Sequence, residues 1–195
     1  MTAAACPVLV IMGVSACGKT VVGRTLASRL GGRFVDGDDH HPADNVAKMA
    51  AGSPLGDVDR WPWLDRLHAI LAAELAGDSP TPLVVACSAL ARRYRDRLRG
   101  GLPLERVRFV HLATDFDTIL GRLDARQGHF MKGRAMLEDQ FATLEPLAPD
   151  ELAAGSLVLD ASNPVEAIVE RIAVLTRPAI NSKFPSPILR ARRST

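Results

Sequence analysis

One stretch near the start of the chain, Gly13 to Thr20, constrains the fold more than any other and reads G-V-S-A-C-G-K-T. It matches the pattern G-x-x-x-x-G-K-[ST], in which the glycines let the backbone turn so tightly that successive N–H groups face a bound phosphate. The lysine brings its ammonium group to the phosphates, and the helix that follows directs its positive end at the anion. We therefore predict a nucleotide-binding loop made of Gly13, Val14, Ser15, Ala16, Cys17, Gly18, Lys19 and Thr20.

The residues on either side give this loop the context that it requires. Before it, Pro7 to Met12 is a continuous aliphatic run, typical of a strand that is buried on both faces. After it, Val22, Leu26 and Leu30 lie four residues apart, and the pattern stops at a pair of glycines, as at the end of a helix. A glycine-rich turn with no special purpose is the alternative, and this context argues against it.

Strand and helix signals alternate along the rest of the chain. Apolar residues have helical spacing from Trp63 to Leu75, and Asn163 followed by Pro164 marks the start of a last helix. Further strands are predicted at Arg33 to Asp36, Leu83 to Cys87, Val107 to Leu112 and Leu157 to Asp160. Because strands separated by helices pair in parallel through crossover connections, we predict an α/β fold of three layers, α/β/α, with a central parallel sheet.

Size and charge limit the classes of protein to which the chain can belong. With 195 residues, 47% of them hydrophobic, it is long enough for one globular domain, which we place at residues 1–176. Residues 177–195 are rich in proline and arginine and are predicted to form a flexible tail. A net charge of +2 argues against a nucleic-acid partner.

Neither a membrane span nor a disulfide framework is expected. No apolar run is long enough to cross a bilayer, and the chain starts without the basic segment of a signal peptide. The three cysteines, Cys6, Cys17 and Cys87, are far apart and form no C-x-x-C pair, which also argues against a zinc site. We therefore expect a cytoplasmic protein.

Aspartates follow the second predicted strand in the stretch F-V-D-G-D-D-H-H-P. The carboxyl ends of parallel strands face one crevice, so Asp36 and Asp38 are expected across from the phosphate loop. Asp36 and the hydroxyl of Thr20 can hold Mg²⁺, directly or through water. Asp38 can accept the proton of an attacking hydroxyl while Lys19 stabilises the phosphates, and these two are the predicted catalytic residues. The alternative is a solvated acidic turn that caps a helix near Pro42. The features together predict a P-loop kinase that uses ATP and Mg²⁺.

Longer stretches resemble one family of small-molecule kinases. Asp36 to Leu64 reads D-G-D-D-H-H-P-A-D-N-V-A-K-M-A-A-G-S-P-L-G-D-V-D-R-W-P-W-L, and Cys87 to Arg99 reads C-S-A-L-A-R-R-Y-R-D-R-L-R. Arg126 to Phe130 reads R-Q-G-H-F and is followed by Gln140, Phe141, Leu144 and Glu145. In this order, and with the phosphate loop, these stretches resemble the gluconokinase family over roughly residues 8 to 175.

The resemblance implies a relative of the adenylate and shikimate kinases that phosphorylates D-gluconate at its terminal hydroxyl with Mg-ATP. The products would be ADP and 6-phospho-D-gluconate, which enters the pentose phosphate pathway. Family members are commonly homodimers, so a homodimer is expected. Two alternatives stay open: a kinase for a nucleoside or another small hydroxylated acid such as shikimate, and a nucleotide-binding protein without turnover.

Gluconate carries a carboxylate and five hydroxyls, so its pocket needs cationic forks and polar donors. Within the resembling stretches, the predicted substrate-binding residues are Asp38, His41, Lys48, Arg60, Ser88, Arg95 and His129. His41 is expected to donate a hydrogen bond to a polyhydroxylated substrate, and Ser88 lies in a turn that should line the pocket. Because Arg92 to Arg99 also has the composition of a charged helix face, a purely structural role is the alternative for its arginines.

A kinase must keep water away from the transferred phosphoryl group, so a segment that carries cations is expected to close over it. We predict this small helical lid at about residues 122–140. Arg122 and Arg126 lie four residues apart on one helix face, and the resemblance to adenylate-kinase-like enzymes implies that both contact ATP. The loop from Ala161 to Asn163 is expected near the adenine.

Two positions depart from the family pattern. Ala16 stands where the loop usually has glycine, so either its φ is positive, at a cost of about 1 kcal/mol, or the backbone there is right-handed. Ala91 stands where the family usually has lysine, which removes one cation from the substrate side unless Arg92 replaces it.

Overall fold

Five parallel strands lie at the centre of the computed structural model, which describes residues 8–77, 79–124 and 130–176. The strands are β1 (Val8–Met12), β2 (Arg33–Asp36), β3 (Leu83–Ala86), β4 (Val107–Ala113) and β5 (Leu157–Asp160). Their order across the sheet is β2-β3-β1-β4-β5, and every neighbouring pair is parallel. The strand that leads into the phosphate loop, β1, is therefore central, with β2 and β3 on one side of it and β4 and β5 on the other.

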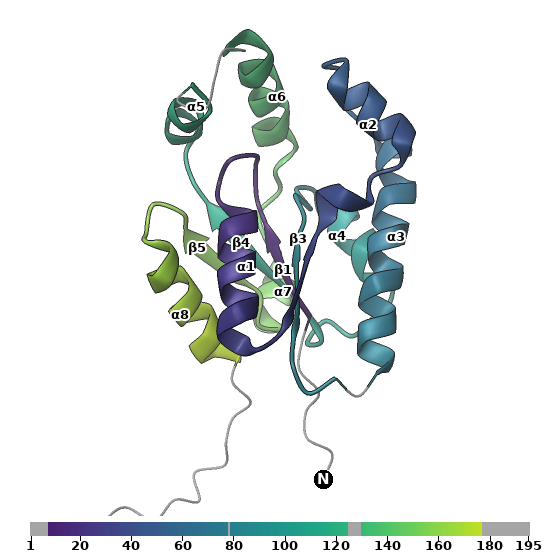
Figure 1. Cartoon of the computed structure of the whole chain (residues 1–195), viewed down its shortest axis with the longest axis vertical. Coiled ribbons are helices and arrows are strands. Elements are labelled where there is room, and N and C mark those ends of the chain that lie inside the picture. Colours follow the sequence, from purple (N-terminus) through teal and green to yellow (C-terminus); the bar gives the residue numbers. More distant parts are fainter. Residues whose placement is uncertain (1–7, 78, 125–129, 177–195) are drawn as a thin grey trace, which may run out of the picture.

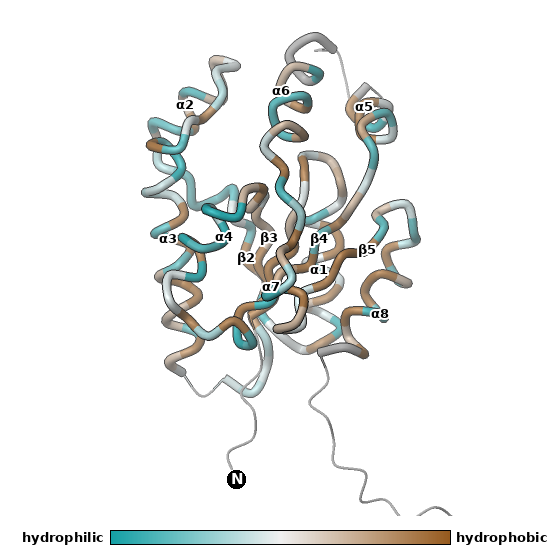
Figure 2. Tube along the Cα trace, turned by 180° about the vertical axis from the view of Figure 1, so that it is seen from behind, coloured by the Kyte–Doolittle hydropathy of each residue, from teal (hydrophilic) through white to brown (hydrophobic). Residues whose placement is uncertain are grey.

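Helices cover both faces of this sheet (Figure 1). The covering helices are α1 (Lys19–Leu30) and α8 (Val165–Thr176) on one face, and α3 (Asp57–Ala76) and α4 (Arg92–Arg99) on the other. Because side chains alternate along a strand, β1 supplies Leu9 and Ile11 to one apolar cluster and Val10 and Met12 to the other. Figure 2 shows the apolar strands enclosed between the helices. The predicted three-layer α/β/α fold is confirmed.

The remaining helices are the 3-10 helix η1 (Gly37–His40), α2 (Ala43–Ala50), α5 (Phe116–Asp124), α6 (Phe130–Thr143) and α7 (Pro149–Ala153). In Figure 1, α2 rises above the sheet on one side and the pair α5 and α6 on the other, with the phosphate loop between them. The predicted lid, residues 122–140, comprises the end of α5, most of α6 and the residues between them, which lie outside the described ranges. The predicted tail, 177–195, also lies outside them.

Helix α3 begins at Asp57, earlier than the helical pattern from Trp63 predicted. The carboxylate of Asp59 accepts a hydrogen bond from the N–H of Gly56 at 2.7 Å, which satisfies a free donor at the start of the helix. Pro62 lies inside the helix and removes one backbone donor from it. The capping interaction thus extends the helix beyond its apolar pattern.

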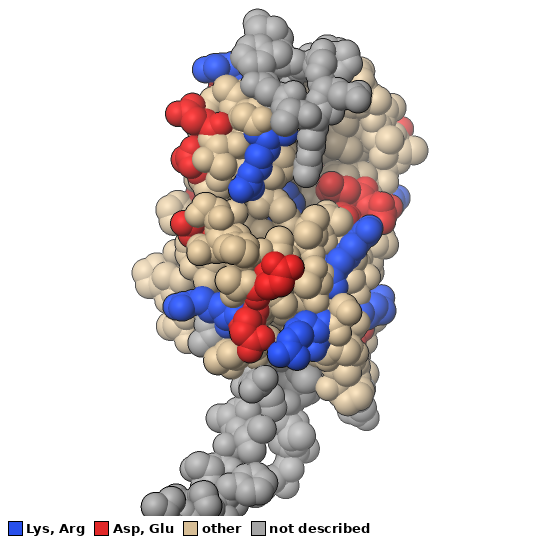
Figure 3. All heavy atoms as spheres, turned by 60° about the vertical axis from the view of Figure 1, so that its left-hand side comes forward, with Lys and Arg blue, Asp and Glu red and all other residues tan. Residues whose placement is uncertain are grey.

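Charges of both signs are interspersed on the face of the molecule shown in Figure 3, without a broad patch of either sign. This distribution agrees with the net charge of +2. Within the described ranges, every helix is too short or too polar to cross a bilayer.

Candidate active site

The phosphate loop has the backbone conformation that its glycines predict. Gly13 has a φ of 138° and Gly18 a φ of 108°, both in the region that favours glycine. A Cβ atom on Gly13 would lie 3.0 Å from the sulfur of Cys17 and 3.0 Å from the carbonyl oxygen of Leu112, so a side chain would crowd the turn. Ala16 has a φ of 60°, which is the first of the two outcomes considered for this position. The loop therefore tolerates backbone strain of about 1 kcal/mol at this residue.

The predicted catalytic and metal-binding side chains of the loop lie close to the acidic turn. Lys19 donates from Nζ to the carbonyl oxygen of Val14 at 2.8 Å, so its ammonium group folds over the loop. Thr20 donates from Oγ1 to Oδ2 of Asp36 at 3.0 Å. The other carboxylate oxygen of Asp36 accepts the N–H of Asp38 at 3.3 Å. The end of β2 is thereby joined to the first turn of α1.

A hydroxyl and a carboxylate in contact are the hard oxygen donors that Mg²⁺ prefers, so Thr20 and Asp36 fit this ion. No group of three His, Cys, Asp or Glu side chains in the described ranges could hold a metal ion. An ion at Thr20 and Asp36 would therefore complete its coordination with phosphate oxygens and water, as is usual for Mg²⁺ in kinases.

The charges of the site converge around the buried thiol of Cys87. Burial above all, together with the carboxylates of Asp38 and Asp36, raises the pKa of this thiol to about 12, against the opposing effects of the Ala89 backbone hydrogen bond and the Lys19 ammonium. With such a pKa the thiol stays protonated, so it is a core residue and no nucleophile. Within the described part of the chain, the exposed carboxylate of Asp38 accepts no hydrogen bond from a side chain, which leaves it free to accept a proton.

The ring of His41 stacks on the indole of Trp63, with 4.2 Å between the ring centroids. The indole Nε1 donates to the carbonyl oxygen of Gly37 at 2.7 Å and so fixes the turn that carries Asp38. Burial lowers the pKa of His41, Asp38 opposes this shift, and Arg60 adds to it. The predicted substrate residues Asp38 and Arg60 thus both lie close enough to His41 to affect its charge.

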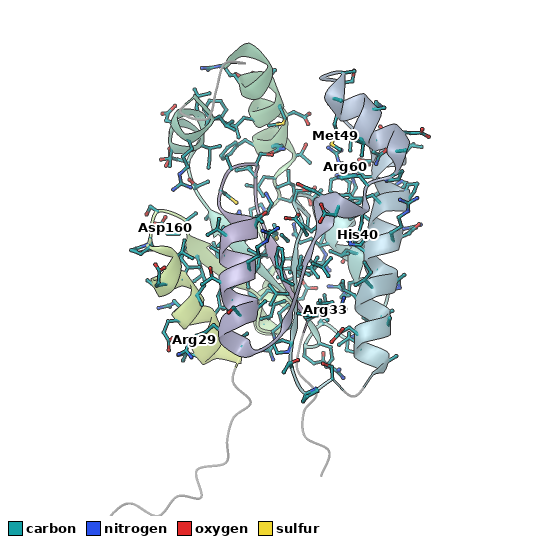
Figure 4. All side chains as sticks on the ribbon, viewed as in Figure 1. Arg29, Arg33, His40, Met49, Arg60 and Asp160 are labelled. Carbon is teal, nitrogen blue, oxygen red and sulfur yellow. The ribbon has the colours of Figure 1, made fainter. Side chains whose placement is uncertain are left out.

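Of the predicted substrate-binding cations in the described ranges, Lys48, Arg60 and Arg95, Arg60 alone has no carboxylate partner there. Its Nη1 donates to the hydroxyl of Tyr94 at 3.0 Å, and its guanidinium lies 5.1 Å from the centroid of the Tyr94 ring. Figure 4 places Arg60 on the side of α3 that faces the molecule's interior. Lys48 is half-exposed and forms an ion pair with Asp59. Such an exposed pair is weak, so an anionic ligand can compete for Lys48.

Arg95 requires a correction, because its side chain is fully buried and its donors are occupied. Nε and Nη2 donate to the two carboxylate oxygens of Glu151 at 2.8 and 3.0 Å. Nη2 also donates to the carbonyl oxygen of Pro146, and Nη1 donates to the carbonyl oxygens of Leu90 and Glu145. Arg95 therefore supports the frame of the site, and the predicted substrate role is wrong for this residue.

The other arginines of α4 make ion pairs on the surface, as the alternative interpretation of this helix held. Arg92, which could replace the family lysine absent at position 91, pairs with Asp96 and Asp150. Further pairs of the helix are Arg92 with Glu151, Arg93 with Asp57 and Glu145, Arg97 with Asp65, and Arg99 with Asp96.

The turn after β3, which is predicted to line the pocket, lies against the phosphate loop. The carbonyl oxygen of Ser88, which is half-buried, accepts the N–H of Gly13 at 3.2 Å. The next residue, Ala89, has a φ of 45°, and its carbonyl faces Arg95. The same turn thus connects the phosphate loop to the buried Arg95.

Gln140 connects helix α6 to the phosphate loop, a role that the sequence pattern did not reveal. Its Oε1 accepts the N–H of Ser15 at 2.6 Å, and its Nε2 donates to the Ser15 hydroxyl at 2.9 Å. Further along, Glu145 accepts the N–H of Arg92 at 2.7 Å, at the start of α4. Both residues stood in the family-like stretch, and that was the only signal for them.

Arg122 lies on the side of the site where the nucleotide is expected to bind. Arg122 donates from Nη2 to the carbonyl oxygen of Ala161 at 3.2 Å, so it touches the loop expected near the adenine. Burial raises the pKa of the Cys17 thiol, while the charges of Lys19 and Arg122 oppose it, which brings Arg122 near the phosphate loop as well. The predicted residues Arg126 and His129 lie outside the described ranges.

Comparison with known proteins identifies relatives of this chain. Residues 8–147 match a family model described as an AAA domain. The gluconokinase of Gluconobacter oxydans is 47% identical over 144 residues, which cover 73% of this chain and 78% of the relative. The thermoresistant gluconokinase of Escherichia coli is 44% identical over 162 residues, or 83% of this chain and 89% of the relative.

Solved structures give the same result. An unliganded sugar kinase from Janibacter sp. has a TM-score of 0.77 and 41% identity, covering 89% of this chain and 96% of the other. A gluconokinase from Sinorhizobium meliloti has a TM-score of 0.74 and 39% identity, covering 88% of this chain and 92% of the other. The fold, the phosphate loop and these relatives together show that the chain belongs to the gluconokinase family of P-loop small-molecule kinases.

Proposed function

We propose that the protein transfers the γ-phosphoryl group of ATP to the terminal hydroxyl of D-gluconate, forming 6-phospho-D-gluconate and ADP. The observation that carries this proposal is the hydrogen bond of 3.0 Å between Thr20 and Asp36, which joins the phosphate loop to the acidic turn. A nucleotide held by the loop and an alcohol held by the turn therefore meet at one place.

The phosphate loop binds the triphosphate through backbone N–H groups and the positive end of α1. Lys19 exchanges its contact with Val14 for the phosphates and stabilises the charge that develops during transfer. Arg122, which lies between the loop and Ala161, contacts the nucleotide from the other side. Thr20 and Asp36 would hold Mg²⁺, which would neutralise negative charge on the phosphates.

Asp38 acts on the acceptor. Its exposed carboxylate accepts the proton of the attacking hydroxyl and orients that oxygen toward the phosphorus. The N–H of Asp38 is bound by Asp36, so the metal-binding and the proton-accepting carboxylates keep a fixed relation to each other.

The gluconate carboxylate and hydroxyls bind to the residues around the acidic turn. Arg60 supplies an unpaired guanidinium, which suits a carboxylate because it can donate two parallel hydrogen bonds. Lys48, His41 and Ser88 add donors for the hydroxyl groups. His129 of the family-like stretch remains part of this proposal.

A coupled assay that measures ADP release from Mg-ATP tests the proposal, with gluconate, shikimate and a nucleoside as acceptors. We expect release that depends on gluconate and little with the other two. Faster release with shikimate or the nucleoside would assign the enzyme to another acceptor. ATP binding without release on any acceptor would indicate a nucleotide-binding protein without turnover.

We infer a homodimer, as the family resemblance implies, and a reducing cytoplasm, because Cys17 and Cys87 are both free and buried. Light scattering during size-exclusion chromatography tests the first point, with a monomer mass contradicting it.

A further inference from the structure

Asn45 is a buried polar side chain next to the acidic turn, and its environment is unusual for an asparagine. It lies in the first turns of α2 and is 4% exposed. A buried amide is costly unless it is hydrogen-bonded, so its partners show what it does there. These partners are His41 and the backbone of Asp59.

The two contacts determine where the proton of His41 lies. Nδ2 of Asn45 is 2.8 Å from the carbonyl oxygen of Asp59, and since a carbonyl oxygen can only accept, this amide atom must be the nitrogen. The same nitrogen lies 3.3 Å from Nδ1 of His41 and has a second hydrogen to donate. Nδ1 must therefore accept, which leaves the ring proton on Nε2.

The opposite edge of the ring is open. Nε2 has no hydrogen-bond partner among the described residues, and it is not one of the buried atoms that lack a partner, so solvent can reach it. The stacked indole of Trp63 holds the plane of the ring. Protonation of His41 would place an Nδ1–H against the Asn45 amide hydrogens, so this arrangement favours the neutral ring. Burial, which lowers the pKa of His41, acts in the same direction.

We propose that Asn45 is a positioning residue that holds His41 as a neutral imidazole with its proton on Nε2, where it donates to a hydroxyl of the polyhydroxylated acceptor. This inference rests on the proposed function for the identity of that acceptor. A neutral donor suits a site in which Asp38 must accept a proton, because a cation beside Asp38 would weaken it as a base.

The first test reads the tautomer directly and needs no turnover. In protein labelled with ¹⁵N-histidine, the ring signals of His41 are assigned by their loss in His41→Gln. We expect the Nε2–H tautomer in the wild type. In Asn45→Asp, the carboxylate accepts from Nδ1 instead, so we expect the Nδ1–H tautomer or the doubly protonated ring. An Nδ1–H tautomer in the wild type, or an Asn45→Asp ring identical to the wild type, would overturn the inference.

The second test separates positioning from a general structural role. Asn45→Asp should raise the KM for gluconate about tenfold, as expected for the loss of one good hydrogen bond, with the KM for ATP unchanged. In His41→Gln the side-chain amide can donate whatever residue 45 is. Adding Asn45→Asp to His41→Gln should therefore change the KM for gluconate less than about twofold. Equal losses in both backgrounds would show that Asn45 acts through Asp59 alone and would refute the proposal.

The role of Asn45 and the proposed function are disproved by different results. An Nδ1–H tautomer in a wild type that phosphorylates gluconate would remove the role of Asn45 and leave the proposed function intact. A wild type with the Nε2–H tautomer and no turnover of gluconate would remove the proposed function and the acceptor with it.

Discussion

The charged residues around the site differ in whether a partner already holds their charge. Arg95 and Glu151 are buried and paired, and Lys48 is paired at the surface. Asp38 and Arg60, in contrast, have no partner of opposite charge within the described ranges. Groups that act on a ligand must offer unused donors or acceptors, so the roles of Asp38 and Arg60 can be tested residue by residue.

Replacing Asp38 by Asn should lower kcat by about 10² to 10⁴, because the site loses its proton acceptor while the shape of the side chain is kept. The affinity for ATP should stay the same, since Asp38 is not part of the phosphate loop. Steady-state kinetics and nucleotide titration measure the two quantities. Asp39→Asn, on the exposed neighbour, is the matched control and should turn over normally. Normal turnover in Asp38→Asn would exclude this residue as the base.

Replacing Arg60 by Ala should raise the KM for gluconate by about 10- to 100-fold, the effect of losing a hydrogen bond to a charged group. The KM for ATP should change little. Arg97→Ala is the control, because Arg97 is exposed and already paired with Asp65. Equal effects of both substitutions would mean that Arg60 acts only through its charge, as part of the overall electrostatic potential of the protein.

At the scale of elements, a few polar contacts join the helices α4, α6 and α7 to the phosphate loop and to the turn after β3. Gln140 joins α6 to the phosphate loop, and Glu145 joins the segment after α6 to the start of α4. Arg95 joins α4 to Glu151 of α7 and to the turn after β3. The position of the phosphate loop thus depends on residues far from it in sequence.

Replacing Gln140 by Leu removes both hydrogen bonds to Ser15 while keeping an apolar stem of similar size. Without these hydrogen bonds the loop is less ordered before ATP binds, and binding must then order it. We therefore expect the KM for ATP to rise about three- to tenfold, the effect of losing one or two hydrogen bonds. Asp139→Asn, on the exposed face of the same helix, is the control. An unchanged KM for ATP in Gln140→Leu would show that packing alone holds the loop.

Replacing Arg95 by Met should lower the free energy of unfolding by about 3–5 kcal/mol, because the buried carboxylate of Glu151 loses its partner. Urea unfolding measures this loss, and Arg97→Ala, which breaks an exposed pair, should cost less than about 1 kcal/mol. Similar values for the two variants would contradict the structural role of Arg95.

The same pair predicts a dependence of stability on pH. Burial alone would raise the pKa of Glu151, but the hydrogen bonds from Arg95 and Ala148 outweigh it and leave the pKa below its usual 4.5. A group with a lowered pKa stabilises the fold above its unfolded-state value and loses this effect as the pH falls through its folded-state value. The stability difference between the wild type and Glu151→Gln should therefore be largest near neutral pH and shrink in acid. A difference that stays constant below pH 4.5 would contradict this assignment.

At the scale of the whole molecule, the fold follows from patterns that a sequence displays openly. Buried strands alternate with amphipathic helices, and the phosphate loop lies where a strand meets a helix. The site is harder to predict from the sequence, because each residue that holds it in place contacts a partner distant in sequence. The sequence alone gives Arg95 the appearance of an exposed helix residue, because its partner Glu151 is distant in the chain. The role of Gln140 is likewise recognised only from its contact with Ser15 in the folded structure.

The central position of β1 in the order β2-β3-β1-β4-β5 has a consequence for how such enzymes diversify. The described residues that we propose to bind the acceptor follow β2 or β3, whereas Arg122 and the loop at Ala161 follow β4 and β5. Evolution can therefore remodel one half of the sheet to accommodate a new alcohol while the half that handles the adenosine end is inherited unchanged.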